Sequence, residues 1–416
     1  MSCAFENEPT LPADFVARSV LEVYASTGYK PSNPSHFTIL AALFLYRSPA
    51  LSSDTPEFRI ISLGTGTKCL PTCQLPLHGE ALHDSHAEII ARRGAIRWFL
   101  EEIQRMSQSD TSCSEWLAIT SEGVYKLQDG SHVGMYISTP PCGDASTRFL
   151  AAAPQDAEMA ALKDSAFRPP VDPTAAARGR DNYALTGVLR TKPGRADAPP
   201  TMSMSCSDKI AAWSVLGFQG ALASFVLPEP MHITHIVVGD VPEDMRSVVL
   251  EDCERALWKR AGPSAYRPII HFTSLDFVHS RAAVSSTIGS PCNTSSNESL
   301  SWIADTVPPS EIIVNGTRRG VPPKHQLRPK SLPRISQLGL FRLFCSLNPV
   351  PYASLGATYD EIKQTAEEYK LAKSRLIGRL GAFAGWQRSD PRLQRFDAEG
   401  NIVENVERAS SQTDLP

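Results

Sequence analysis

The 416-residue chain is 42% hydrophobic and 20% charged, a composition typical of globular proteins with one large domain or two to three ordinary ones. Its formal net charge of -3 excludes a protein that binds every polyanion, so a nucleic-acid partner would be held by local basic patches. The nine cysteines are scattered and no apolar signal segment is seen, which predicts reduced thiols in a non-secreted protein of the cytoplasm or nucleus. No apolar run is long enough to span a bilayer, so no membrane role is expected.

The first elements predict a helix and then a β-hairpin. Residues 14–27 carry apolar side chains at helical spacing, which predicts a helix that faces the core. Residues 37–45 and 58–63 are apolar runs on either side of a Ser/Pro-rich turn, and the simplest interpretation is a hairpin.

A second helix is predicted after the triplet His86-Ala87-Glu88. Apolar residues over 89–103 fall on one helical face, and Asp84 or Ser85 is the candidate N-cap. His86 and Glu88 are therefore expected at a helix start.

Two cysteines are also expected at helix starts. A strand predicted over residues 133–138 stops at two prolines, which places Cys142 at a strand-to-helix junction. Helical spacing resumes after Cys206, with Ser207 or Asp208 as the candidate N-cap. Helix N-termini favour thiolates, so both cysteines lie where anionic ligands are stabilised.

The second half predicts a mixed α/β sheet, because strands over residues 232–239 and 266–272 flank a helix over 245–260. A short strand follows at 311–314. Helices are expected over residues 334–345 and 360–383.

The preferred organisation is a single domain over residues 1–398. Residues 151–181, rich in Ala, Pro and Asp, and residues 285–300, rich in Ser and Asn, are expected to be surface insertions. Residues 399–416 are expected to form a disordered tail.

The chemistry of the chain is carried by His86, Glu88, Cys142 and Cys206, which together indicate a catalytic zinc site. One imidazole and two thiolates supply three ligands and leave the fourth position to water, while Glu88 is a carboxylate that is not a ligand. Zinc lowers the pKa of its water toward about 7, and Glu88 can move the proton to a ring nitrogen and the leaving ammonia. Hydrolytic deamination uses all four groups. The pattern departs from the compact Pro-Cys-x-x-Cys signature, since Ala145 stands where the second thiol would be.

Segments 82–93, 141–145, 189–195 and 204–209 resemble the adenosine-deaminase domain of the RNA editases, and more closely its eukaryotic tRNA-specific branch. The resemblance runs from about Ser19 to Trp386, with no double-stranded-RNA-binding module expected before it. It implies a cytidine-deaminase-like α/β fold, with three α/β/α layers around a mixed sheet and an enlarged helical C-terminal part. It also implies conversion of adenosine to inosine at position 37 of alanine tRNA. No obligate protein partner is evident from the sequence.

The resemblance carries roles over to individual residues. His86, Cys142 and Cys206 would be the ligands of one zinc ion, and Glu88 the proton shuttle. The remaining candidates would contact the substrate: Thr67 and Lys68 in the loop that touches an extruded nucleotide, and Arg190, Lys192 and Arg195 in the loop that fills the gap behind it. The messenger-RNA editases carry a glutamate in that second loop, and this chain does not, so Arg195 or the Gly194 backbone is expected to contact the tRNA instead.

The family also implies a buried inositol hexakisphosphate, which cations must surround because a buried charge requires compensation. The candidate residues are Arg92, Arg93, Lys209, Tyr359, Lys363, Tyr369, Lys373 and Trp386. From periodicity alone, the last helical segment is equally a solvated charged helix. Asp84 and Lys209 are the hypothetical relay between zinc and polyanion.

Other interpretations stay open at this point. The chain could act on another RNA, be another zinc hydrolase such as a cytidine or free-nucleoside deaminase, or be a catalytically silent RNA-binding homologue. Glu88 argues against the silent form, because a structural zinc site needs no carboxylate beside an open position. A basic run either tracks tRNA phosphates or decorates a loop: Arg318, Arg319, Lys324, Arg328, Lys330 and Arg334.

Overall fold

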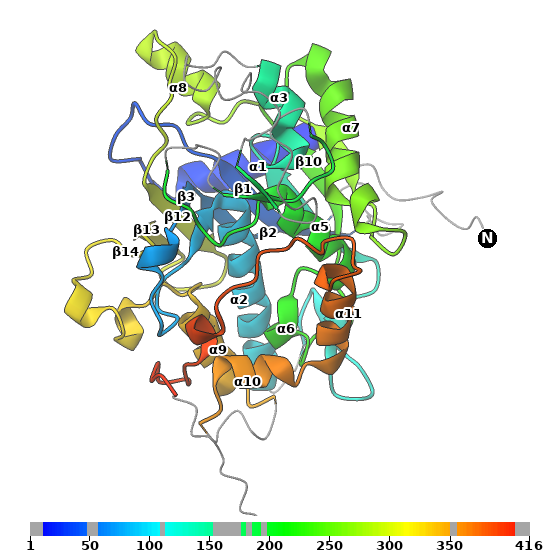
Figure 1. Cartoon of the computed structure of the whole chain (residues 1–416), viewed down its shortest axis with the longest axis vertical. Helices are drawn as coiled ribbons and strands as arrows, with labels where there is room; N and C mark the ends of the chain where they lie inside the picture. Colours follow the sequence, from blue (N-terminus) through cyan, green and yellow to red (C-terminus); the bar gives the residue numbers. More distant parts are fainter. Residues whose placement is uncertain are drawn as a thin grey trace, which may run out of the picture.

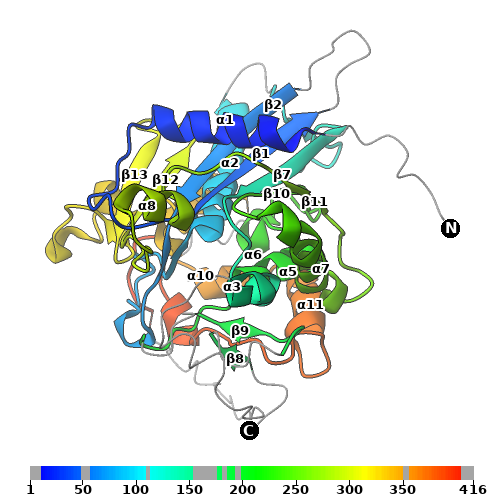
Figure 2. The same ribbon diagram turned by 90° about the horizontal axis from the view of Figure 1, so that it is seen from above.

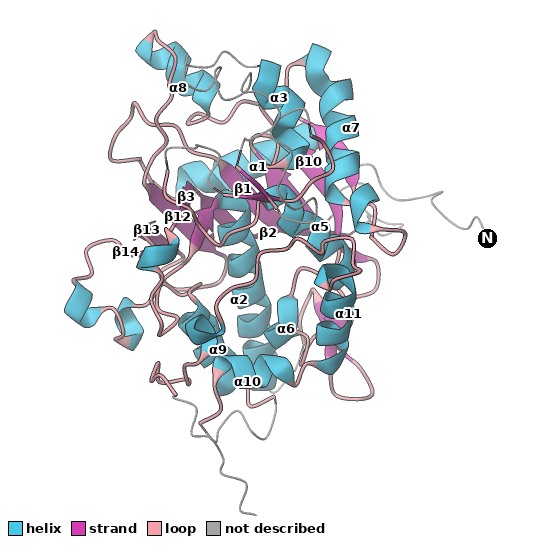
Figure 3. Cartoon of the chain, in the orientation of Figure 1, coloured by secondary structure: helices cyan, strands magenta, loops and turns pink. Residues whose placement is uncertain are grey.

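The computed structural model describes residues 11–47, 57–108, 113–152, 176–179, 185–192, 198–349 and 356–403. A mixed eight-stranded sheet runs through the molecule in the order β11-β10-β7-β1-β2-β12-β13-β14 (Figures 1 and 3). Its strands are β1 (Leu40–Arg47), β2 (Glu57–Thr65), β7 (Ser131–Ile137), β10 (Ile233–Val238), β11 (Ile269–Phe272), β12 (Glu298–Ile303), β13 (Ser310–Val314) and β14 (Thr317–Arg318).

Strands β7, β10 and β11 run parallel to one another, and the other neighbours in this sheet pair antiparallel. Three two-stranded pairs lie outside it: β3 (Thr67–Cys69) with β4 (Asp84–His86), β5 (Leu117–Ile119) with β6 (Tyr125–Leu127), and β8 (Ala177–Arg178) with β9 (Arg190–Thr191).

Helices cover both faces of the sheet, which gives three layers (Figure 2). They are α1 (Ala13–Ser26), α2 (Ala87–Gln108), α3 (Thr147–Ala152), α5 (Cys206–Leu216), α6 (Gly220–Ala223), α7 (Arg246–Leu257), α8 (Arg281–Ile288), α9 (Gln337–Ser346), α10 (Tyr359–Gln364) and α11 (Glu367–Ile377). None of these described helices is both long and apolar enough to cross a lipid bilayer.

The central strand β1 shows why two helical layers form. Side chains alternate along a strand, so Ala41, Leu43 and Leu45 join the core that includes α2 and α5. The intervening residues, including Phe44, join a second core with α1. Because both faces of β1 are apolar, both must be covered. The predicted α/β class with a mixed central sheet is confirmed.

The first helix, the hairpin and the helix between β10 and β11 are confirmed, but both N-cap predictions are wrong. Helix α2 begins at Ala87, because Asp84 and Ser85 belong to β4. Helix α5 begins at Cys206, and its N-cap is Ser205, whose hydroxyl accepts a hydrogen bond from the Asp208 N–H.

The predicted extent of the loop over residues 285–300 is also wrong at both ends. Helix α8 continues to Ile288, and β12 starts at Glu298 and lies inside the sheet between β2 and β13. The serines of β12 made the segment resemble a polar loop in the sequence. In the structure, the Ser299 hydroxyl donates a hydrogen bond to the Ser85 carbonyl. The single helix expected over 360–383 is two helices, α10 and α11.

The two remaining predictions fall largely outside the described residues. Of residues 151–181, only 151–152 and 176–179 are described. Of residues 399–416, those up to Val403 are described, and Ile402 forms a bridge with Phe396, so residues 399–403 do not belong to a disordered tail; residues 404–416 lie outside the described residues.

Gly134 on β7 provides a test of the packing between the central strands. It pairs with Phe44, and a Cβ added at Gly134 would lie 2.1 Å from the phenyl ring. We expect Gly134→Ala to lower the free energy of unfolding by about 1–3 kcal/mol. Phe44→Leu in the same chain should relieve part of that loss, which chemical denaturation of the two single variants and the double variant measures. Strictly additive losses would contradict the contact.

Candidate metal centre

Three possible metal-donor atoms converge at the end of β4 and the start of α5. The Sγ atoms of Cys142 and Cys206 lie 3.7 Å and 3.5 Å from Nδ1 of His86. All three donors lie within 4.8 Å of one another. Residues from three separate parts of the chain thus form one cluster, as the motif predicted.

The separations fit a tetrahedral ion. With sulfur at about 2.3 Å and nitrogen at about 2.1 Å from zinc, a tetrahedral angle puts the two ligand atoms about 3.6 Å apart. The observed separations lie on either side of that distance. One imidazole and two thiols are also the donor types that zinc binds in catalytic sites.

The two cysteine loops are held together by short backbone contacts. The Ser207 N–H donates to the Cys142 carbonyl at 3.0 Å, and the Ser207 hydroxyl donates to the same oxygen at 2.8 Å. Gly143 has φ of +105°, and a Cβ there would lie 2.2 Å from the Ser205 hydroxyl oxygen. Only glycine fits this position, because a side chain would separate the loops.

Glu88 lies in the first turn of α2 with 1% of its surface exposed. Its Oε2 has no hydrogen-bond partner among the described residues. Burial, and next the charge of Cys142, raise the pKa of this carboxyl group. A buried carboxyl group with a raised pKa suits proton transfer near neutral pH.

A buried ion cluster lies behind the donors. The Asp84 carboxylate accepts hydrogen bonds from Lys192 Nζ at 2.7 Å, from Lys209 Nζ at 2.5 Å and from the His86 N–H at 3.1 Å. Lys192 Nζ also lies 3.2 Å from Cys206 Sγ. Burial opposes the charged form of Asp84, but the two ammonium groups hold its pKa well below the usual value. The cluster connects the ligand His86 to two lysines.

The substrate candidates fall into different environments. Thr67 and Lys68 are on β3, where Thr67 pairs with His86. Arg190 is buried and donates to the carbonyls of Gly179 and Leu185, which directs its guanidinium to the protein interior. Arg195 lies outside the described residues.

The environment of Lys192 differs from the predicted RNA contact. Lys192 is 3% exposed and contacts Asp84 and the Cys206 sulfur, so it faces the candidate metal ligands rather than an open surface. A lysine inside a predicted RNA-contacting loop gives no local sign of burial.

A second cluster, of cations, lies farther along α2. Arg92 stacks on Trp213 at 5.0 Å and donates to the Phe218 carbonyl, and Arg93 donates to the Ile335 carbonyl. Neither arginine forms an ion pair with a described carboxylate. Burial lowers the pKa of Arg92 to about 10.

The C-terminal candidates join this cluster. Burial, followed by the charges of Lys363, Arg388 and Arg92, lowers the pKa of Lys373 to about 8. Lys363 Nζ lies 4.8 Å from the centre of the Tyr359 ring, and Tyr369 and Trp386 pack against the main core. Among the described residues near these cations, one carboxylate pairs with the set, namely Asp84 through Lys209. The cluster is therefore short of negative charge.

The basic run after β13 is partly paired. Arg318 lies 3.6 Å from Glu311, and Arg319 lies 3.2 Å from Glu298. Lys324, Arg328 and Lys330 are exposed. The run thus contributes both to the packing of β14 and to the surface.

Comparisons of the sequence with a family model and with individual proteins agree on one family. Residues 62–390 match the adenosine-deaminase (editase) domain. The chain is 28% identical to the mouse protein named tRNA-specific adenosine deaminase 1, over 88% of this chain and 95% of the mouse one. It is 29% identical to the protein of that name from Saccharomyces cerevisiae, over 77% and 78% of the two chains. Against the Drosophila melanogaster double-stranded RNA-specific editase Adar, identity is 29% over 60% of this chain and 36% of that one.

Gly143→Ala tests the close approach of the cysteine loops. The added Cβ would displace Ser205 and move Cys142 away from Cys206, so we expect metal affinity to fall by roughly 10-fold or more. Metal retained after dialysis against a chelator measures the loss. Gly123→Ala is the control, because Gly123 also has a positive φ of +78° but has open space around its Cα. Equal metal retention in the two variants would show that the contact is unimportant.

Proposed function

The chain belongs to the adenosine-deaminase (editase) domain family, and we propose that it converts adenosine to inosine in tRNA, at adenosine 37 beside the anticodon of alanine tRNA. The observation that carries this proposal is the buried Glu88 carboxyl group beside His86, Cys142 and Cys206, whose Oε2 has no hydrogen-bond partner among the described residues. The similarity to proteins named tRNA-specific adenosine deaminase, over most of both chains, supports tRNA as the substrate.

His86, Cys142 and Cys206 would hold a zinc ion, because their number, type and separations suit it. When bound, zinc supplies the acidity that lets a water lose a proton near neutral pH. The remaining chemistry belongs to the protein.

Glu88 would take one proton from the attacking water and pass it to the purine ring nitrogen, and would then take the second proton from the added oxygen and pass it to the departing amine. The water oxygen bonds to the purine C6, the bond from C6 to the amino nitrogen breaks, and ammonia leaves. No redox partner is needed. The raised pKa of Glu88 fits both halves of this cycle, because the group must first bind the proton and then release it.

Lys192 and Lys209 would hold the ligand shell in place from behind. Lys192 donates toward Cys206 and Asp84, and Asp84 accepts from the His86 backbone. Partners of this kind orient metal ligands and tune their basicity. We therefore propose that Lys192 acts behind the metal ligands, while Thr67, Lys68 and Arg195 remain the proposed tRNA contacts.

The cation cluster on α2, α10 and α11 would surround an inositol hexakisphosphate. Its arginines and lysines are half-buried without enough carboxylates, and Arg93 has a buried nitrogen with no partner among the described residues. A buried polyanion would supply the missing charge and hydrogen bonds. Lys209 joins this cluster to Asp84, which supports the proposed relay to the metal ligands.

Glu88→Gln tests the catalytic role. The amide keeps the shape but cannot accept the proton, so we expect inosine formation in alanine tRNA to fall by about 10²–10⁴-fold. Reverse transcription across position 37 reads the change, while zinc content and tRNA affinity stay as in the wild type. Glu102→Gln on the same helix is the control, since Glu102 pairs with Arg105 away from the site. An active Glu88→Gln enzyme would exclude the proposed shuttle.

Arg93→Met tests the polyanion. We expect the purified wild-type protein to release inositol hexakisphosphate on acid denaturation, and the variant to retain less of it and to be less stable, because the ligand stabilises only the folded state. Arg97→Met is the matched control, since Arg97 lies on the same helix and is paired with Glu101 at 2.7 Å. Wild-type protein that folds fully without any bound inositol phosphate would refute this assignment.

A further inference from the structure

Each candidate cysteine ligand is followed, two residues later, by a buried aspartate. The two segments are Cys142-Gly143-Asp144 and Cys206-Ser207-Asp208, and both aspartates are 0% exposed. Neither aspartate belongs to the predicted metal ligands or to the cation cluster. Buried carboxylates require partners, and both find them at the C-terminal end of α7.

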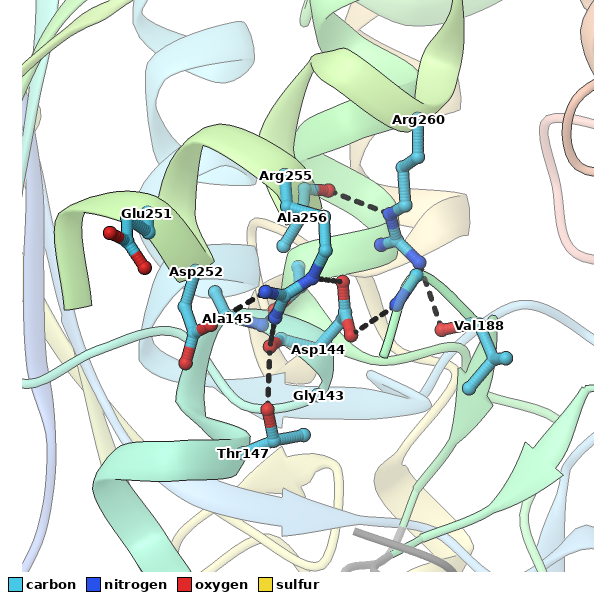
Figure 4. Close-up of polar contacts among 12 residues, drawn as sticks. Gly143, Asp144, Ala145, Thr147, Val188, Glu251, Asp252, Arg255, Ala256 and Arg260 are labelled. Atoms are coloured by element: carbon cyan, nitrogen blue, oxygen red, sulfur yellow. Dashed lines mark hydrogen bonds and ion pairs between the residues drawn. The ribbon is translucent and has the colours of Figure 1, made fainter. Parts of the chain in front are cut away.

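Arg255 binds the first aspartate. Its Nε donates to Asp144 Oδ2 and its NH2 group donates to the Asp144 carbonyl, both at 3.1 Å. Its NH1 group donates to Asp252 on the same helix at 2.6 Å. Figure 4 shows the guanidinium between the two aspartates. The Cys142 loop is thereby fixed to α7.

Arg260 binds the second aspartate. It follows α7 in a 3-10 turn (Lys259–Ala261), and its NH2 group donates to Asp208 Oδ1 at 2.5 Å. Its Nε donates to the Ala256 carbonyl at 2.8 Å, and its NH1 group donates to the Val188 carbonyl at 2.9 Å (Figure 4). The start of α5, with Cys206, is thereby fixed to the same helix.

The same aspartates also hold the segment before the predicted RNA-contacting loop. The Gly187 N–H donates to Asp144 Oδ1 at 2.8 Å, and the Arg190 N–H donates to Asp208 Oδ2 at 2.9 Å. The Val188 carbonyl between them is satisfied by Arg260. The aspartates and Arg260 therefore pair three backbone groups of this segment.

We infer that Arg255 and Arg260 are positioning residues that set the spacing of the two cysteine ligands and lock residues 187–190 to them. We call this pair, with Asp144 and Asp208, the α7 clamp. The inference rests on the proposed zinc-dependent activity and adds four residues that touch neither metal nor substrate. Through the clamp, a shift of residues 187–190 is transmitted to both cysteine loops.

Arginine is suited to this role and lysine is not. Each guanidinium makes three directed hydrogen bonds, to acceptors on different segments, from one rigid planar group. A lysine ammonium keeps the charge but cannot span the same acceptors. Arg255→Lys and Arg260→Lys therefore test the geometry of the clamp while conserving its charge.

The measurement is the rate at which zinc passes from the purified protein to a chromogenic chelator. We expect both lysine variants to release zinc roughly 10-fold faster or more, because partners behind metal ligands have effects of that size. We also expect kcat with alanine tRNA to fall more than KM changes, and deuterium uptake over residues 185–192 to rise.

Arg148→Lys is the matched control. Arg148 also makes three contacts with α7, to Asp252, Glu251 and the Val248 carbonyl, but none to Asp144 or Asp208. It shares Asp252 Oδ1 with Arg255, so the variant disturbs only the part of the network that lies on α7. It should release zinc at the wild-type rate. A purely structural role for the clamp would lower the melting temperature of the lysine variants and leave zinc release below that temperature unchanged, which would overturn the inference.

Two further outcomes are distinguishable. If Arg260→Lys does not fold, the isosteric Asp208→Asn variant removes the same ion pair and should show the same faster release, and normal release from it would overturn the inference. If the wild-type protein binds no zinc or forms no inosine, the proposed function fails as well. If the wild-type protein binds zinc and is active, but both clamp variants release zinc at the same rate as Arg148→Lys, the clamp is rejected and the proposed function stands.

Discussion

Buried negative charge is the constraint on which the rest of this structure depends. A cysteine binds a metal as a thiolate, and both cysteine loops also bury an aspartate two residues on. Unpaired, such charges would cost far more than folding can offset. Three of these four groups are met by a cation: Lys192 at Cys206, Arg255 at Asp144 and Arg260 at Asp208. The fourth, Cys142, lies 3.7 Å from Nδ1 of His86.

Helix α2 also connects the cysteine loops to a region with an excess of half-buried positive charge. Glu88 is in its first turn, and Arg92 and Arg93 follow about one turn later. The contact between Asp84 and Lys209 lies between the two regions. A polyanion held by the cation cluster would thus stabilise the lysine that orients Asp84 and, through it, His86.

Local patterns predicted the parts of the site that are contiguous in sequence, and failed where contacts are distant. The triplet containing His86 and Glu88 can be recognised from the two-residue spacing of the histidine and the glutamate and from its position at a helix start. The contacts between Asp144 and Arg255 and between Asp208 and Arg260 join residues 111 and 52 positions apart, and no local period encodes them. Strand β12 was missed because its buried serines resemble a loop. Ser205 was passed over as a cap because two equally suitable polar residues follow Cys206.

The central claim is that the His86, Cys142, Cys206 and Glu88 cluster performs zinc-dependent deamination of a tRNA adenosine. The most direct measurement incubates purified protein with alanine tRNA, before and after zinc removal and re-addition, and reads every position by reverse transcription. The account predicts an adenosine-to-inosine change at position 37 that requires zinc, with no action on free adenosine or on cytidines. Folded, zinc-loaded protein that leaves the tRNA unchanged would contradict it.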